Sequence, residues 1–444
     1  MGTKGQTNMN FKIHRGTQEI GGSCVEIWTD TTKIIVDIGM PLVVSDGQEF
    51  DFKQYQNLST SELVLKGILP DVDGLYGNTS SKVDGILISH YHQDHHGFLS
   101  YADTSIPIFT GKATQSILEF SEEFFKGKQL NNRFQNFSKD TSFSIGDITI
   151  HPYWMDHSAF DAYAFLIESN GKRLFYSGDF RGHGRKDKVF KWFLHNAPQN
   201  VDYLLMEGTT IGRKQQSFPT EKDLEETFID IFNSKQEINL INTSAQNIDR
   251  LVTIYRACKR TNKLMVVDVY TAAIMKEMAN FATIPFASPS FPEVKVMYPY
   301  FLSKMIADKI GKEFLYQFQP FKITKEEISE KRKDIVFLIR PSMKMDIDRI
   351  DKMENGNFIY SMWSGYLEQP KTKTFIEHLK LKGFSFHQVH TSGHADVETL
   401  KEMVTAMKPK NLVPIHTFDG DDYKDIFKDV NVKRAKDKEN IEIK

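Results

Sequence analysis

The chain has 444 residues, and its 56 Lys and Arg against 58 Asp and Glu give a formal net charge of −2. At roughly 150 residues per domain, this length suggests two or three domains. The hydrophobic share of 40% and the charged share of 26% are typical of a globular protein, and they exclude disorder, collagen and a simple coiled coil. The near-zero charge excludes a uniformly basic surface, so a polyanion would have to bind in a local groove.

The cysteines and the apolar runs bear on the cellular compartment. Cys24 and Cys258 allow at most one disulfide, and no CxxC metal motif is present. The first residues lack the apolar segment of a signal peptide, and no apolar run reaches the roughly 18 residues that a transmembrane helix needs. We therefore expect a cytoplasmic protein with no membrane partner.

The first two hundred residues alternate short apolar, β-branched runs with turn signals, which is typical of strands. A helical spacing of Ile117, Phe120 and Phe124 predicts a helix over 112–125. The predicted strands are Phe11–His14, Ser23–Thr29, Lys33–Asp37, Asp84–Ser89, Ile106–Thr110, Ile148–Tyr153, Ala164–Glu168, Arg173–Ser177 and Tyr203–Met206.

After Glu207, helices alternate with strands, a pattern that favours a parallel sheet. Thr220 followed by acidic residues predicts a helix start. The predicted helices are Ile248–Lys259, Thr271–Asn280, Tyr300–Ala307 and Lys325–Asp334, and the strands are Asn239–Asn242, Lys263–Asp268, Ile335–Ile339 and Asn357–Tyr360. The chain then returns to strand, helix and strand at Ser385–His390, Ala395–Met407 and Asn411–Ile415. No low-complexity linker separates these blocks, so the middle looks inserted between two outer parts.

A histidine cluster at the end of an apolar strand is the strongest chemical signal. The segment from His90 to His96 reads HYHQDHH, which places five potential metal ligands within seven positions. His90 and His92 can point the same way from an extended segment, while Asp94 and His95 would open a helix and face a second metal. Histidine and carboxylate together suit Zn²⁺ or a similar divalent ion. The surrounding strand and helix signals argue against a low-complexity, metal-scavenging tract.

Two metal sites need further ligands, and three candidates follow apolar strands. His157 follows the strand segment ITIHPYWMD, Asp179 follows the segment RLFYSG, and His416 follows the segment NLVPI. Asp179 suits a bridging role, because one carboxylate can hold two cations. Taken singly, each is more often a satisfied polar residue than a ligand.

Together these residues resemble the metallo-β-lactamase fold family, whose ligand order they match along the chain. Further motifs are similar to the β-CASP branch of nucleases, and to ribonuclease J within it. They are TQEIGGSCVEI in the opening strand pair, Glu207 in LLMEGTT (motif A), the helix of NTSAQNIDRLVTIYRACK, SGYLEQ at the return from the insert, His394 in HTSGHAD (motif B) and His416 in VPIH (motif C). Glu at motif A is more typical of the RNA 3′-processing branch, and Thr-Phe-Asp-Gly replaces the usual Gly-Glu after motif C.

The resemblance implies an α/β fold: a metallo-β-lactamase αββα sandwich with an inserted α/β (β-CASP) domain of parallel-sheet type. The expected divisions are residues 1–208 and 361–444 for the two parts of the sandwich, and residues 209–360 for the insert. Two divalent metal ions, Zn²⁺ or Mn²⁺, would activate a water for attack on a phosphodiester.

The resemblance also implies a role for each site residue. One metal would be held by His90, His92 and His157, and the other by Asp94, His95 and His416, with Asp179 bridging. Asp37, after a strand, would orient the site from behind the ligands. The predicted catalytic residues are Asp94, which helps to orient the attacking water, His394 as general acid and Glu207 as its partner. Ser392, Gly393 and His394 would bind substrate phosphate, although His394 could instead cap the helix beginning at Ala395.

These motifs favour a ribonuclease acting on single-stranded RNA, because DNA-repair members of the branch usually lack the motif C histidine. The alternatives are a DNA nuclease, or a hydrolase of a small molecule such as a lactone, a thioester or a cyclic phosphodiester, which would not need an insert of about 150 residues. A homodimer is left open. Basic clusters could contact the nucleic-acid backbone, with an ordinary solvated surface as the alternative; they lie at Arg181–Lys191 (with His183), Arg256–Lys263 and Lys331–Lys333. Aromatic side chains could stack on bases, with core packing as the alternative; they are Trp363, Tyr366 and Phe418.

Overall fold

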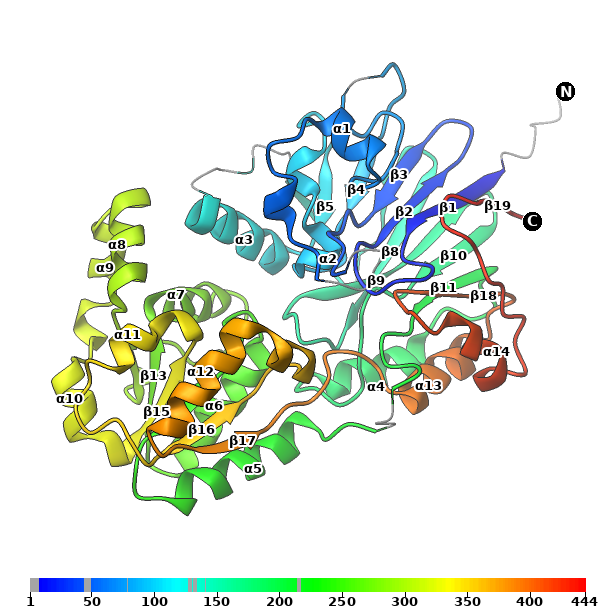
Figure 1. Cartoon of the computed structure of the whole chain (residues 1–444). Coiled ribbons are helices and arrows are strands. Elements are labelled where there is room, and N and C mark those ends of the chain that lie inside the picture. The colour runs from blue at the N-terminus through cyan, green and yellow to red at the C-terminus, as the bar shows by residue number, and fades with distance from the viewer. Residues whose placement is uncertain are drawn as a thin grey trace, which may run out of the picture.

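Two mixed β-sheets packed face to face form the centre of the outer part of the chain (Figure 1). The chain is described from a computed structural model that defines residues 8–43, 49–77, 79–126, 130, 134–139, 141–213 and 217–444. The first sheet has the order β19-β1-β2-β3-β4-β5-β6. Its strands are β1 (Met9–Arg15), β2 (Cys24–Trp28), β3 (Lys33–Val36), β4 (Gly85–Leu87), β5 (Ile108–Thr110), β6 (Phe134–Asn136) and β19 (Asn440–Ile443).

The second sheet has the order β18-β11-β10-β9-β8-β7, and β18, β11 and β10 run parallel. Its strands are β7 (Phe143–Ile145), β8 (Ile148–Met155), β9 (Ala162–Ser169), β10 (Lys172–Tyr176), β11 (Tyr203–Glu207) and β18 (Leu412–Ile415). Alternate apolar residues of both sheets, such as Phe11, Ile27, Phe165 and Leu205, meet in a buried core between them. Since β19 pairs with β1 and β18 with β11, residues from both ends of the chain complete the same two sheets.

Helices cover both outer faces, which gives the expected αββα sandwich. On the first sheet lie α1 (Thr60–Leu65), α2 (Gln93–His96) and α3 (Lys112–Ser121), and on the second lie α4 (Asp187–Asn196), α13 (Val397–Met407) and α14 (Tyr423–Ile426). The helix predicted to Phe125 changes at Glu122 into a π-helical turn, Glu122–Lys126. The helix α4 was not predicted as one, since its basic residues were interpreted as a charge cluster.

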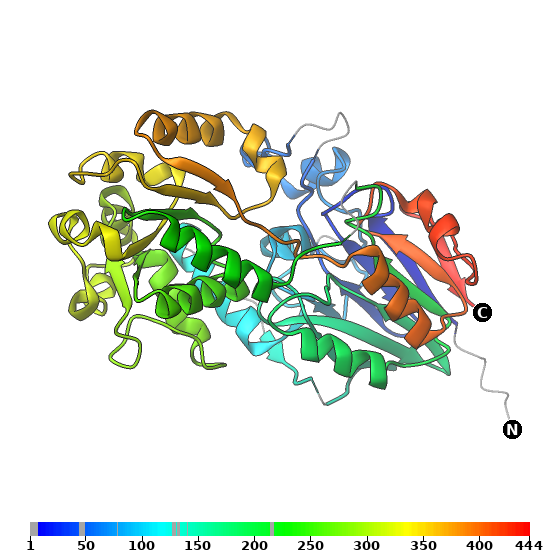
Figure 2. The same cartoon turned by 90° about the horizontal axis from the view of Figure 1, so that it is seen from below.

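The middle of the chain builds a third sheet, which is entirely parallel, with the order β14-β13-β15-β12-β16-β17 (Figure 2). Its strands are β12 (Asn239–Asn242), β13 (Leu264–Asp268), β14 (Val294–Met297), β15 (Ile335–Ile339), β16 (Asn357–Tyr360) and β17 (Ser385–Gln388). The accompanying helices are α5 (Glu221–Ser234), α6 (Ile248–Arg260), α7 (Val269–Met278), α8 (Tyr300–Lys309), α9 (Glu313–Tyr316), α10 (Lys325–Glu330), α11 (Lys344–Ile347) and α12 (Pro370–Leu381). The inserted parallel-sheet unit of the predicted fold class is therefore present.

The parallel sheet continues beyond the boundary expected at residue 360. β17 pairs with β16 in parallel register, and the apolar face of α12, with Phe375 and Leu379, packs against the same sheet. This boundary was wrong because SGYLEQ was taken as the return to the sandwich, whereas the chain first adds one more helix and strand to the insert.

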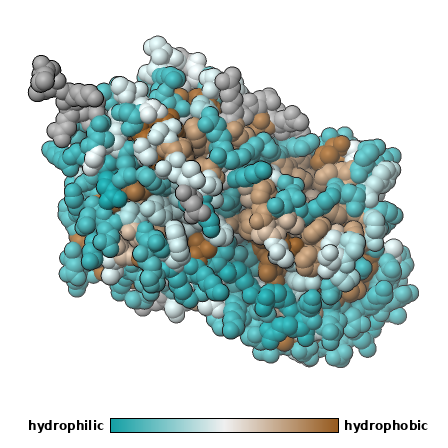
Figure 3. Space-filling view, turned by 180° about the vertical axis from the view of Figure 1, so that it is seen from behind, coloured by the Kyte–Doolittle hydropathy of each residue, from teal (hydrophilic) through white to brown (hydrophobic). Residues whose placement is uncertain are grey.

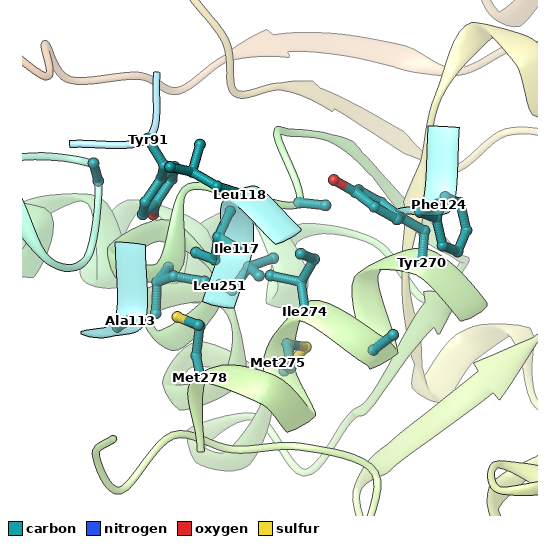
Figure 4. Close-up of a cluster of buried hydrophobic side chains, with 14 of the residues drawn as sticks. Tyr91, Ala113, Ile117, Leu118, Phe124, Leu251, Tyr270, Ile274, Met275 and Met278 are labelled. Carbon is teal, nitrogen blue, oxygen red and sulfur yellow. The ribbon is translucent and has the colours of Figure 1, made fainter. Parts of the chain in front are cut away.

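An apolar interface joins the insert to the sandwich (Figure 4). Ile117 and Leu118 of α3 pack with Leu251 of α6 and with Ile274 and other residues of α7, and the whole group is buried. Burial of this kind fixes the orientation of the insert relative to the sandwich.

The surface is mostly hydrophilic on the face opposite to the view of Figure 1, with hydrophobic residues gathered in one area (Figure 3). Exposed aromatic side chains of the insert include Tyr300 and Phe301 on α8 and Tyr316 on α9. Among the residues that the structure describes, none of the helices has both the length and the apolar character needed to cross a membrane.

Candidate metal centre

The candidate site lies where several strands end. Asp179, Glu207 and His416 stand at or just beyond the carboxyl ends of β10, β11 and β18, which are parallel neighbours and therefore deliver their following residues to one edge of the sheet. His157 follows β8 of the same sheet, and the histidine cluster follows β4 of the facing sheet. The fold thus brings together side chains separated by more than three hundred residues.

Three imidazoles form the first ligand set: His90, His92 and His157. His92 Nδ1 and His157 Nε2 face each other at 3.1 Å. His157 Nδ1 donates to the carbonyl oxygen of Gly393 at 2.5 Å, which leaves Nε2 unprotonated and free to bind a metal. The potential ligand atoms of the set all lie within 4.8 Å of one another.

Asp94, His95, Asp179 and His416 form the second set, again within 4.8 Å. His416 Nε2 lies 3.2 Å from Asp94 Oδ2, and His95 Nε2 lies 3.1 Å from Asp179 Oδ2. The same Asp179 oxygen is 3.8 Å from His90 Nε2 of the first set. The carboxylate of Asp179 therefore lies between the two sets, as a bridging ligand would.

Buried polar atoms left without partners fit bound cations. His90 Nε2 and Asp179 Oδ1 are buried and accept or donate no hydrogen bond within the described part of the chain, a costly state unless something else satisfies them. Burial lowers the pKa of His92 to about 4 and lowers the pKa values of His90 and His157 well below their usual range, which keeps these imidazoles neutral and able to bind a metal.

The carboxylates of the second set are held in their charged form. Burial by itself would raise the pKa of Asp179, but the neighbouring imidazoles of His416 and His95 hold it well below the usual range. Burial would also raise the pKa of Asp94, but the hydrogen bond from His416 and the charges of His95 and His416 together lower it. The neutral imidazoles of the first set and the ionised carboxylates of the second set fit divalent ions such as Zn²⁺ or Mn²⁺. Burial would lower the pKa values of His95 and His416, but the carboxylates beside them raise these values, and a bound cation would take the place of the protons that they favour.

Asp37 supports the site from behind the ligands. It is fully buried, follows β3 with a left-handed φ of 59°, and accepts hydrogen bonds from Ser89 N at 2.8 Å and from Ser89 Oγ, His95 Nδ1 and Tyr176 Oη at 2.7 Å each. Because Nδ1–H of His95 points at Asp37, Nε2 of that ring faces the site. The two additional donors, Ser89 and Tyr176, were not predicted.

Thr209 is a further site residue that was not predicted. Its hydroxyl lies 2.9 Å from His416 Nδ1, so it orients the imidazole with Nε2 toward Asp94. Its backbone N–H donates to Glu207 Oε2 at 2.9 Å. The signal was present in LLMEGTT, where a hydroxyl stands two residues after the motif A acid.

Glu207 and His394 lie side by side at the edge of the second set. His394 Nδ1 is 3.5 Å from Glu207 Oε1 and 3.6 Å from Asp179 Oδ2, and it has no hydrogen-bond partner within the described residues. Backbone N–H groups of Thr209 and Ala395 hold the Glu207 carboxylate. The N-cap of α13 is Asp396, which accepts from Thr399 N, so His394 does not cap this helix.

The loop of Ser392, Gly393 and His394 packs tightly against the first ligand set. A Cβ on Gly393 would lie 2.8 Å from Ser158 Oγ, so only glycine fits there without displacement. The carbonyl oxygen of Ser392 accepts hydrogen bonds from Arg181 Nη1 at 2.9 Å and His183 Nε2 at 3.0 Å. Two buried side chains, Arg181 and His183, therefore fix the position of this loop.

Two of the basic clusters have structural roles. Arg181 is fully buried and pairs with Asp249 of α6 at 2.5 Å, and His183 is 7% exposed, so neither is part of a solvated loop. Arg256 and Arg260 pair with Glu225 on α5. These side chains tie the insert to the sandwich and the insert helices to each other, and their charges are already neutralised.

Comparisons with known proteins agree with this geometry. Residues 74–237 match a β-lactamase superfamily domain, and residues 384–420 match a Zn-dependent metallo-hydrolase RNA specificity domain. The chain is 22% identical over 411 residues to ribonuclease J of Helicobacter pylori strain 26695, covering 90% of this chain and 55% of that protein. It is 23% identical to ribonuclease J of Mycoplasma genitalium, covering 90% of this chain and 66% of that protein. The chain thus spans about half the length of the Helicobacter relatives.

Among solved structures, a protein of unknown function from Enterococcus faecalis V583 superposes with a TM-score of 0.78 at 21% identity, covering 98% of this chain and all of that one. This likeness extends over the sandwich and the insert together. The predicted fold class is confirmed by the match of residues 74–237 to a β-lactamase superfamily domain and by the observed sheets.

Proposed function

Because residues 74–237 match a β-lactamase superfamily domain and residues 384–420 match an RNA specificity domain of Zn-dependent metallo-hydrolases, we propose that the protein is a metal-dependent ribonuclease that hydrolyses phosphodiester bonds in single-stranded RNA. The observation that carries the proposal is the meeting of two ligand sets around Asp179, with His394 and Glu207 at their edge. Bound there, two divalent cations would lower the pKa of a water molecule and neutralise charge on the phosphodiester.

The protein residues would divide the work as follows. His90, His92 and His157 hold one ion, and Asp94, His95 and His416 hold the other, with Asp179 shared. Asp94 would accept a hydrogen bond from the attacking water and so help to orient it. These assignments are supported by the ligand atoms facing one another and by the low pKa values that keep the imidazoles of the first set neutral.

His394 would act as the general acid. Its Nδ1 lies 3.5 Å from Glu207 Oε1, so a hydrogen bond from Nδ1–H to Glu207 would leave Nε2 to deliver a proton to the departing 3′-oxygen. The loop of Ser392 and Gly393 would hold the substrate phosphate next to this ring. The proximity of the loop to both His157 and His394 supports this role.

A cleavage assay tests the proposal. The protein, loaded with Zn²⁺ or Mn²⁺, is incubated with 5′-labelled single-stranded RNA and DNA, each with a 5′-monophosphate or a 5′-hydroxyl end. We expect the RNA to be cut, and we expect metal analysis to find about two ions per chain. His92→Ala should lose both metal and activity, while His195→Ala, which changes an exposed histidine on α4, should retain both.

The pattern of products also separates the remaining alternatives. Mononucleotides released from one end indicate an exonuclease, and internal fragments an endonuclease. Cleavage of DNA alone would replace the proposal with a DNA nuclease. Hydrolysis of a lactone, a thioester or a cyclic phosphodiester without cleavage of either polymer would replace it with the small-molecule hydrolase.

A further inference from the structure

An exposed tryptophan lies between the insert and the sandwich. Trp363 stands between β16 and the 3₁₀ segment Ser364–Glu368, and it is 47% exposed. The guanidinium of Arg213 lies 5.8 Å from the centroid of its indole, and Tyr366 meets it edge-on with centroids 5.3 Å apart at 88°. The ring is thus held in place by two neighbours although half of it remains open.

The backbone is adapted to this position of the ring. A Cβ on Gly365 would lie 2.2 Å from Trp363 Cζ3, so the indole rests directly on the glycine and any other residue would displace it. A flat ring fixed in advance loses little conformational freedom when a second flat group stacks on it.

The residues around the indole reach the metal centre from two sides. Arg213 lies six residues after Glu207, the last residue of β11; burial lowers the pKa of Arg213, and the charge of Glu207 acts against that effect. Burial raises the pKa of Tyr366, and the carboxylate of Asp94 adds to that effect. Through Arg213, the indole is therefore linked to the segment that follows Glu207.

The loop of Arg213 also packs against the loop of motif C. A Cβ on Gly212 would lie 2.3 Å from Asp419 Oδ2, which places the two loops in direct contact. Phe418, two residues after His416, is 51% exposed. In contrast to Arg181, Arg256 and Arg260, Arg213 makes no ion pair with the described residues, so its charge is available to a ligand.

We propose that the pair of Trp363 and Arg213 is a stacking platform for one nucleobase of single-stranded RNA next to the scissile phosphate, with the base lying on the part of the indole that Arg213 and Gly365 leave exposed; the inference rests on the proposed function. Every base has a π-face, so such a platform takes any nucleotide, and the arginine contributes both a stacking plane and a positive charge for a neighbouring phosphate. It would position the strand so that the next phosphate enters the metal centre.

Binding of a fluorescent single-stranded RNA with a hydrolysis-resistant phosphorothioate backbone tests the platform by anisotropy. We expect Trp363→Ala to bind roughly 5- to 150-fold more weakly than the wild type, and Trp363→Phe to recover much of the loss. Trp192→Ala is the matched control, because Trp192 is 48% exposed on α4. It should bind like the wild type.

An abasic nucleotide moved along the RNA identifies the stacked base. At one position it should weaken binding to the wild type by the same factor as Trp363→Ala, and it should have no further effect on that variant. Equal binding by Trp363→Ala and Trp192→Ala, with an active wild type, overturns the platform alone. A wild type that neither binds nor cuts RNA overturns the proposed function and the platform with it.

Discussion

At the scale of single residues, Asp37 shows how a buried carboxylate prepares a metal ligand. It accepts four hydrogen bonds, including one from His95 Nδ1. In Asp37→Asn the amide nitrogen cannot accept, so His95 loses its fixed tautomer, and we expect roughly 10- to 100-fold weaker metal binding. Competition with a chromogenic chelator measures the affinity for the metal ion, and Asp30→Asn, at an exposed position, is the control. Unchanged affinity would mean that the ligands hold the ion without this support.

His394 is the residue whose replacement separates chemistry from metal binding. Its ring lies close to Glu207 and Asp179 but outside the two ligand sets that the proposal assigns to metals. We expect His394→Ala to lower turnover by roughly 10²–10⁴-fold while the metal content stays at the wild-type level. Metal analysis and single-turnover cleavage of labelled RNA check the two parts. Loss of an ion from this variant would make His394 a ligand, and unchanged turnover would remove it from catalysis.

At the scale of helices, a buried ion pair joins the two N-terminal helices of the insert. Arg250 of α6 and Glu221 of α5 are fully buried, with Nη2 and Oε1 at 2.9 Å. Arg250→Met leaves the carboxylate without its main partner and should lower the free energy of unfolding by about 3–5 kcal/mol. Urea denaturation measures it. Arg260→Met, on the same helix but 46% exposed, should cost less than about 1 kcal/mol; similar losses in both variants would contradict the argument.

The same pair gives the stability a defined pH dependence. Burial would raise the pKa of Glu221, but Arg250 and Arg181 outweigh it and lower the pKa to about 2, from 4.5 in an unperturbed carboxyl. A carboxyl with a lowered folded-state pKa contributes stability above its unfolded pKa and loses it in acid. The contribution is therefore complete above pH 4.5 and disappears toward pH 2, so the difference between the wild type and Arg250→Met should narrow in acid.

The sequence predicted the elements best where apolar runs are bounded by turn signals. β12, β15 and β16 have the predicted bounds, because each is a short buried run between helices. The short strands β6, β7 and β14 were missed, since three or four residues carry too little periodicity. For the site, the candidate ligands could be predicted because they lie in local sequence motifs. The contacts of Thr209, Tyr176 and Arg181 could not be predicted, because they join distant segments and depend on the fold.

At the scale of the whole molecule, interleaving of the two parts explains why the site lies where it does. The strands that close the sandwich, β18 and β19, come after the insert, so His416 cannot reach the centre until the insert has been accommodated. The loop of Ser392 and Gly393 connects β17 of the insert to α13 of the sandwich. The residues proposed to bind substrate and those proposed to bind metal therefore meet at the junction between the two parts.

The overall charge predicts a weak salt dependence of RNA binding. The formal charge is −2, and buried or helix-borne arginines such as Arg181, Arg250 and Arg260 are neutralised by carboxylates. Because these arginines between the insert and the sandwich and along the helices of the insert are already paired, we expect only two to four phosphate contacts and a slope of log K against log salt of about −1.5 to −3, at about 0.7 per contact for a single strand. Anisotropy titrations between roughly 50 and 200 mM salt give the value. A slope steeper than about −5 would require seven or more phosphate contacts and would point to a basic groove that the paired arginines do not provide.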